Sequence, residues 1–217
     1  MSKVAIESVF TDIKSAAVIV AHPDDEILWA GGTILLHLQI NWTVLTLCRK
    51  SDPDRAPRFS KVANLLGAKG FMADLDDSPD QKPLEQAEIQ QAILNTLPQR
   101  SFDIILTHNP KGEYTRHLRH EEVSQAVFTL WKNGKLKAKR LLLSAYEDGR
   151  KKYLPRPQKD ADIVVDLPKS IWQKKKDIII NSYGFSPDSF EAKAVSDTEA
   201  FWLIEKHQDI KKITDRS

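Results

Sequence analysis

The chain has 217 residues, of which 41% are hydrophobic and 29% charged, values typical of a soluble globular protein, and we expect a single domain over residues 1–217. The net charge of +2, with basic and acidic residues interspersed, argues against a nucleic-acid-binding protein. The single cysteine, Cys48, excludes an internal disulfide, and no apolar run near the N-terminus is long enough for a signal sequence or transmembrane helix, so we expect a cytoplasmic protein.

Short β-branched runs alternate with amphipathic segments along the chain. In chain order, the sequence predicts strand 17–21, helix 24–39, strand 43–48, helix 57–66, strand 68–73, helix 84–97, strand 103–107, helix 119–131, strands 141–145 and 162–167, helix 169–183 and helix 199–211. The basic segment 150–160 is expected to be a surface loop or lid. This alternation predicts an α/β, three-layer, Rossmann-like fold, with a mostly parallel sheet covered by helices on both faces.

Two groups of histidines follow two of the predicted strands. His22 comes directly after strand 17–21, and His108, His117 and His120 follow strand 103–107. In open α/β sheets, ligands bind beyond the carboxyl ends of the strands. We therefore expect both groups to project from the same edge of the sheet.

The segment His22-Pro23-Asp24-Asp25-Glu26 has residue types that suit metal-dependent hydrolysis. Such a site needs about three protein ligands and an open position for water. His22 and Asp25 are three residues apart at a strand-to-helix corner, a spacing that can bring both to one ion, whereas Asp24 can face water and accept its proton. A third ligand can come from His117 or His120.

Each motif alone also has an ordinary structural explanation. Acidic residues after a strand often cap a helix, and a pair of histidines at a helix start is often solvated. Only the coincidence of the two motifs at one sheet edge favours a functional site.

The chain resembles the LmbE-like, or PIG-L, family of zinc-dependent N-deacetylases. The resemblance rests on Ala21-His22-Pro23-Asp24-Asp25-Glu26, on Gly31-Gly32-Thr33-Ile34, and on Gly112-Glu113-Tyr114 leading to His117-x-x-His120. It implies removal of an acetyl group from an N-acetylglucosamine unit in a small molecule or glycoconjugate.

The resemblance also implies a role for several residues. His22, Asp25 and His120 look like ligands of one zinc ion, Asp24 like the general base, and His117 like the group that steadies the oxyanion. Two imidazoles and a carboxylate also suit iron.

Three further residues are candidates for binding substrate. Arg55 follows the second strand and can bind a phosphate or carboxylate through its guanidinium group, although a solvated basic loop would explain it equally well. Glu113 and Tyr114 precede His117 and are candidates for substrate contacts, although the polarity expected of any loop would also explain them.

One departure from the family pattern affects His117. The family's second block commonly reads His-Pro-Asp-His, but here it reads His117-Leu118-Arg119-His120. A nearby Arg disfavours an imidazolium. Three alternatives remain: Arg119 points away, His117 works as a neutral hydrogen-bond donor, or another acid supports it.

Two other functions compete with deacetylation. One is an amidase that cleaves a larger acyl group or a thiol conjugate. The other is a non-catalytic sugar- or nucleotide-binding module on the same fold, although binding alone requires no base such as Asp24 beside a metal. The sequence does not determine the oligomeric state, and a homo-oligomer would be unsurprising.

Overall fold

The computed structural model describes residues 6–114 and 117–210. Its main sheet has seven strands in the order β3-β2-β1-β4-β5-β9-β8, and β6 and β7 form a separate hairpin. The strands are β1 Ser15–Val20, β2 Asn41–Cys48, β3 Lys69–Leu75, β4 Ile104–Thr107, β5 Arg140–Ser144, β6 Tyr146–Glu147, β7 Arg156–Pro157, β8 Ile163–Asp166 and β9 Thr198–Ile204. The first five strands of this order pair in parallel, and β9 runs antiparallel to both its neighbours.

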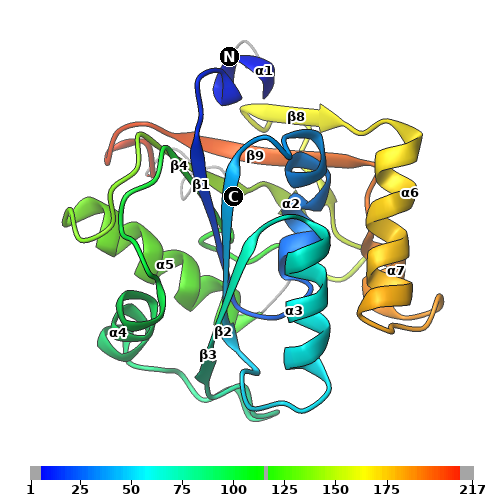
Figure 1. Ribbon diagram of the computed structural model, residues 1–217, viewed down its shortest axis with the longest axis horizontal. Coiled ribbons are helices and arrows are strands. Elements are labelled where there is room, and N and C mark those ends of the chain that lie inside the picture. Colours follow the sequence, from blue (N-terminus) through cyan, green and yellow to red (C-terminus); the bar gives the residue numbers. More distant parts are fainter. Residues whose placement is uncertain (1–5, 115–116, 211–217) are drawn as a thin grey trace.

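Helices cover both faces of the sheet. They are α1 Ile6–Phe10, α2 Asp25–Leu36, α3 Arg55–Leu65, α4 Gln86–Thr96, α5 Leu118–Lys132, α6 Lys169–Asp177, the π-helix η1 Ile178–Ser182, and α7 Phe190–Ala194. Helices α4 and α5 lie on one side, and α2, α3 and α6 on the other (Figure 1). This arrangement confirms the predicted three-layer α/β fold with a mostly parallel sheet.

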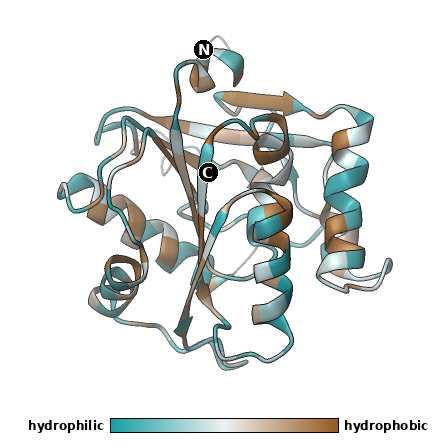
Figure 2. Cartoon of the chain, in the orientation of Figure 1, coloured by the Kyte–Doolittle hydropathy of each residue, from teal (hydrophilic) through white to brown (hydrophobic). Residues whose placement is uncertain are grey.

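The core consists of two hydrophobic clusters, one on each face of the sheet. Every residue of β1 after Ser15 is buried, as expected for a strand covered on both sides. The central strands are mostly hydrophobic, whereas the helices carry both hydrophobic and hydrophilic residues around their surfaces (Figure 2). Gly32 of α2 lies so close to Leu167 that an added Cβ would be 2.4 Å from its side chain, so this glycine permits close packing.

The predicted helix 199–211 is wrong, because residues 198–204 form strand β9. Residue 211 lies outside the described part of the chain. The strand inserts between β5 and β8 and pairs with both. Phe201 and Trp202 are buried, and aromatic residues favour strands. Backbone hydrogen bonds to β5 and β8 on both sides stabilise the segment as a strand and not as a helix.

The strand order changes direction between β1 and β4, since β2 and β3 lie on one side of this pair and β5 on the other. Ligands of doubly wound folds bind at such a switch point, beyond the carboxyl ends of the strands. His22 follows β1 and His108 follows β4, so both stand at this point. Within the described residues, no helix is long and apolar enough to cross a membrane.

Candidate metal-dependent active site

The corner between β1 and α2 holds an unusual backbone conformation at Asp24, which precedes the first residue of the helix and has a φ of 126°. Residues other than glycine rarely adopt positive φ, and such strain concentrates at functional sites. The carboxylate of Glu26 accepts the N–H of Asp24 at 3.0 Å and also the hydroxyl of Tyr183, which directly follows η1. Glu26 therefore holds the Asp24 peptide in this conformation.

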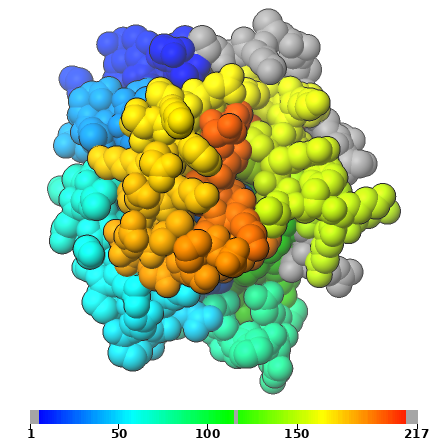
Figure 3. Space-filling model, turned by 90° about the vertical axis from the view of Figure 1, so that its right-hand side faces the viewer, coloured from blue at the N-terminus to red at the C-terminus, as the bar shows by residue number. Residues whose placement is uncertain are grey.

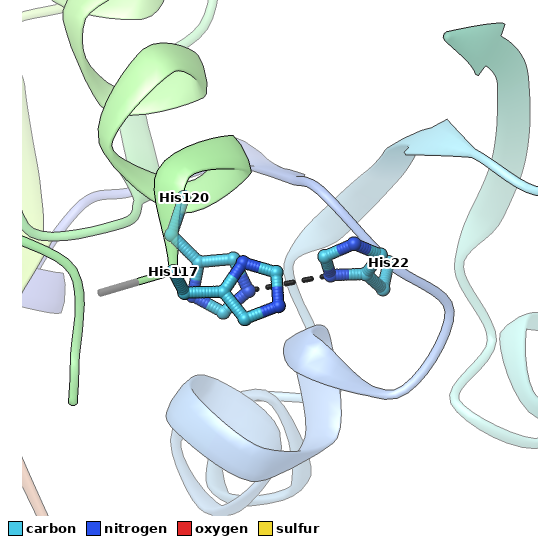
Figure 4. Close-up of side chains that lie close together, drawn as sticks. All are labelled: His22, His117 and His120. Carbon is cyan, nitrogen blue, oxygen red and sulfur yellow. Dashed lines mark hydrogen bonds between the residues drawn. The ribbon is translucent and has the colours of Figure 1, made fainter. Parts of the chain in front are cut away.

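Three side chains from distant parts of the sequence bring potential metal ligands together. His22 Nδ1 lies 3.1 Å from Asp25 Oδ2, and His120 Nε2 lies 3.3 Å from both of these atoms. Zinc–ligand bonds of about 2.0–2.1 Å in a tetrahedral site would separate the ligand atoms by about 3.3 Å. The three side chains therefore fit the donor set and spacing of one zinc ion. Figure 4 shows His22 facing His117 and His120, which lie side by side at the start of α5.

Other side chains near these three are less suited to bind the ion. The groups His22–His117–His120, Asp25–His108–His120 and His22–Cys48–Asp77 also have potential ligand atoms within 4.8 Å of one another. However, both ring nitrogens of His108 are engaged, because Nε2 accepts the N–H of Ala21 and Nδ1 donates to Glu113. Cys48 is buried, and burial raises the pKa of its thiol, which disfavours the thiolate that metals bind.

A carboxylate lies behind each of the two candidate histidine ligands. Asp77 Oδ1 is 3.1 Å from His22 Nε2, and Arg49 donates to its other oxygen. Glu113 Oε2 is 2.6 Å from His120 Nδ1. Such pairs fix the orientation and tautomer of metal-binding histidines, so that His22 presents Nδ1 and His120 presents Nε2.

The electrostatics of this cluster favour a cation. Burial alone would lower the pKa of His22, but Asp25 and Asp77 outweigh it and raise this pKa to about 10. Burial alone would raise the pKa of Asp25, but the facing His120 and His108 hold it well below its usual range. The carboxylates therefore stay ionised and stabilise positive charge beside them, which a divalent metal would supply.

Asp24 differs from Asp25 in its surroundings. Its side chain makes no hydrogen bond within the described part of the chain, and it lines a cavity of about 1080 Å³ together with His22 and His117. Burial, and then the charge of Asp25, raise the pKa of Asp24 well above its ordinary value. A carboxylate with a raised pKa and unused hydrogen-bond capacity can accept a proton from water.

Arg119 was expected to disfavour a protonated His117 if the two side chains were close together. The Arg119 guanidinium points away from His117 and binds Glu122 and the carbonyl of Lys82. No carboxylate pairs with His117 among the described residues, and its buried Nδ1 has no hydrogen-bond partner. Burial, and then the nearby His120, lower the pKa of His117 to about 3, so His117 is a neutral imidazole.

The same cavity contains two of the three residues expected to bind substrate. Arg55 stacks over the ring of Phe185, with 4.2 Å between the guanidinium carbon and the ring centroid, and its buried Nη1 has no hydrogen-bond partner among the residues that the structure describes. Tyr114 packs edge-on against His117 and Phe190. Glu113 does not line this cavity, because its fully buried carboxylate faces His108 and His120.

The structure thus brings together the histidines and both aspartates that the sequence singled out. The sequence analysis did not find two residues that support them, Asp77 and Tyr183, nor the bridging role of Glu26. Asp77 follows β3, so the rule that placed His22 and His108 at the carboxyl edge could have found it. No local signal marks Tyr183, which is 157 residues from Glu26.

Comparison with solved structures finds the same fold in other proteins. The structure is similar to N,N'-diacetylchitobiose deacetylase from Pyrococcus horikoshii, with 17% identity, a TM-score of 0.65, and coverage of 92% of this chain and 86% of that one. It is also similar to 4-carboxy-2-hydroxymuconate hydratase from Pseudomonas putida KT2440, with 18% identity, a TM-score of 0.57, and coverage of 84% and 83%. At these identities the likeness establishes the fold alone.

Sequence comparison gives one curated relative and one family. The uncharacterized protein L374 of Acanthamoeba polyphaga mimivirus is 23% identical over 128 residues, which are 52% of this chain and 56% of that protein, so the match spans little more than half of the relative's length. The model of the PIG-L family, described as GlcNAc-PI de-N-acetylase, matches residues 17–131, a segment that includes the histidine and aspartate cluster. The chain belongs to the PIG-L family.

Proposed function

We propose that this protein is a metal-dependent N-deacetylase that removes the acetyl group from an N-acetylglucosamine-containing small molecule or glycoconjugate. The main support is that three potential metal-ligand atoms, on His22, Asp25 and His120, lie 3.1–3.3 Å apart. Beside them lies the carboxylate of Asp24, which makes no side-chain hydrogen bond to another described residue. The family match, to a model described as a de-N-acetylase, supports the reaction and the sugar.

In this proposal His22, Asp25 and His120 hold one zinc ion, which would supply the Lewis acidity that activates a water molecule and the acetyl carbonyl. Asp24 accepts the proton of the attacking water, whose oxygen bonds to the carbonyl carbon. Neutral His117 donates a hydrogen bond to the oxyanion. The C–N bond then breaks, the proton passes to the leaving nitrogen, and acetate and a free amine are released.

The cavity suggests how the rest of the substrate is held. Arg55 lines the cavity with a guanidinium nitrogen that is unpaired within residues 6–114 and 117–210, and this group can bind a hydroxyl or anionic oxygen of the substrate. Tyr114 and Phe190 form an aromatic wall. Glu113 has no place in substrate binding, because its carboxylate is used by two histidines. We propose instead that it orients His120.

The two aspartates provide a direct test of these roles. We expect about one zinc ion per chain in the purified protein, measured by elemental analysis, and its loss in Asp25→Ala. Asp24→Asn should keep the metal but release acetate about 10²–10⁴-fold more slowly, because it removes the base and leaves the ligands intact. Asp188→Asn, an exposed site, is the control.

Two results would contradict the proposal. Full activity in Asp25→Ala would rule out metal-dependent deacetylation. Loss of metal in Asp24→Asn would mean that the two aspartates have the opposite roles. Iron in place of zinc in the elemental analysis would change only the identity of the ion.

Acyl specificity separates this proposal from its alternatives. A deacetylase should release acetate from N-acetylglucosamine conjugates faster than propionate or butyrate from the matched amides. A preference for the longer chains would favour an amidase of broader scope. Sugar binding without metal and without release of acid would favour a binding module. Measuring acetate itself also distinguishes deacetylation from the hydratase chemistry named for one structure with this fold.

A further inference from the structure

A second cavity, of about 740 Å³, adjoins the candidate active site. It lies between the loop 109–114, which leads towards His117, and the β6–β7 hairpin. Tyr114 lines both this cavity and the one that contains Asp24, so the two cavities meet at this residue. Figure 3 shows the yellow-green segment around residue 150, which joins β6 to β7, projecting from the surface.

The loop of this hairpin has a specific backbone conformation. Gly149, Arg150 and Lys151 have φ values of 58°, 62° and 66°. Residues other than glycine seldom adopt this left-handed backbone conformation. Asp148 supports it by accepting the N–H of Arg150 on its side chain and those of Lys152 and Tyr153 on its carbonyl. The loop therefore presents its side chains from a preformed turn, and strain of this kind concentrates at ligand-binding sites.

Cationic side chains dominate the loop. Residues 149–159 contain five basic residues and no acidic one. Arg156 lies over the ring of Tyr153 and pairs with Glu147. Within the described residues, Arg150, Lys152 and Lys159 have no ion-pair partner, and all three line the cavity.

The acidic residues of the cavity wall leave part of this charge uncompensated. Glu113 faces His108 and His120, Glu147 pairs with Arg156, and Asp148 holds the loop backbone. Asp148 and Asp160 are the remaining acidic residues of the wall, because accepting a backbone N–H does not neutralise the Asp148 carboxylate. Arg150, Lys152 and Lys159 still outnumber these two acids, and this excess of positive charge suits an anionic group such as a phosphate monoester.

We propose that this second cavity binds a phosphate group through Arg150, Lys152 and Lys159. Because the cavity meets the active site at Tyr114, the phosphate belongs to the substrate whose acetyl group is removed beside Asp24. This assignment of the source rests on the proposed deacetylase function, whereas phosphate binding itself does not.

The first test measures binding of inorganic phosphate by titration calorimetry. The triple variant Arg150→Gln, Lys152→Gln, Lys159→Gln should bind phosphate at least about 10-fold more weakly than the wild type. The matched control Lys132→Gln, Lys135→Gln, Lys137→Gln, which removes the same charge at another site, should bind normally. Equal binding in the two triple variants would place phosphate elsewhere, for example at the metal, and would overturn the proposal.

The second test distinguishes a phosphate on the substrate from a free phosphate ligand. The wild type should prefer N-acetylglucosamine 6-phosphate over N-acetylglucosamine by at least about 10-fold in kcat/KM, and the cavity variant should lose this preference. A preference that persists in the cavity variant would overturn the assignment to the substrate. Failure to hydrolyse either sugar would count against the proposed deacetylation, and the phosphate titration would still test the cavity.

Discussion

Glu113 is the side chain whose position departs most from what its sequence context predicts. It was expected to contact substrate, but its two oxygens bind the Nδ1 atoms of His108 and His120 and the N–H of Asn109. The nearby His108 and His120 outweigh burial and hold the pKa of Glu113 well below its usual range, so it stays ionised. As a carboxylate it accepts all these hydrogen bonds and directs His120 Nε2 towards His22 and Asp25.

Glu113→Gln tests this positioning role. The amide has one acceptor oxygen, so its NH₂ group would face a second N–H donor. We expect the zinc affinity, measured by competition with a chelator, to fall about 10–100-fold. The exposed Glu88→Gln should leave this affinity unchanged. An unchanged affinity in Glu113→Gln would show that His120 needs no support from this carboxylate.

Tyr183 does not act on Asp24 directly but through Glu26, which binds both residues. Tyr183→Phe deletes the hydroxyl that Glu26 accepts and leaves Glu26 as the sole holder of the strained Asp24 peptide. We expect kcat for acetate release to fall about 10–100-fold, because even a small displacement of the base slows the reaction. The metal content should stay unchanged, because this displacement does not affect metal binding. A normal kcat in Tyr183→Phe would show that Glu26 alone suffices.

At the scale of elements, Asp103 secures the junction of β1 and β4. Its Oδ2 accepts the N–H groups of Lys14 and Ser15 at the start of β1, and Lys139 lies 3.0 Å from Oδ1. These contacts, Lys139 first, lower the pKa of Asp103 to about 2. Because β1 and β4 carry His22 and His108, this junction also sets the register of the two strands beneath the candidate site.

The depressed pKa of Asp103 gives a prediction with a definite sign. The carboxylate contributes its full stability above its ordinary pKa of 3.8, and this contribution is lost as the pH falls through about 2. We expect Asp103→Asn to lower the free energy of unfolding by about 1 kcal/mol at pH 7, allowing for solvent screening. Urea unfolding at pH 7 and pH 3 should show the difference shrinking, and the exposed Asp160→Asn should show none. A difference that grows towards pH 3 would contradict this assignment.

The sequence predicted the elements that neighbouring residues determine. It failed where an element depends on contacts with residues far away in the chain. The runs at 17–21 and 103–107 became β1 and β4 because continuous β-branched residues suit a strand buried on both faces. The segment 199–211 was predicted as a helix, but its first six residues belong to strand β9. Glu199 is in fact buried, and its partner Lys175 lies 24 residues away, which no local pattern reveals.

At the scale of the whole molecule, the Glu199 carboxylate joins three elements. It accepts the N–H groups of Gly32 and Thr33 in α2, the Thr33 hydroxyl, and the ammonium of Lys175 in α6, at 2.7–2.8 Å. All four residues are buried, and an added Cβ on Gly32 would lie 3.0 Å from Glu199. Helix α2 begins at Asp25, so this network also fixes the helix that carries a proposed metal ligand.

Lys175→Met should be among the most destabilising single changes in the protein. It preserves the length of the side chain but leaves a buried carboxylate without its counter-charge, which typically costs about 3–5 kcal/mol of unfolding free energy. Adding Glu199→Gln to it should restore part of that loss, because the second change removes the unpaired charge. Lys174→Met, one residue away on the exposed face of α6, should cost little. Urea unfolding of the wild type, these three variants and the single variant Glu199→Gln measures these differences. A loss in the double variant equal to the sum of the two single changes would mean that the two side chains act independently.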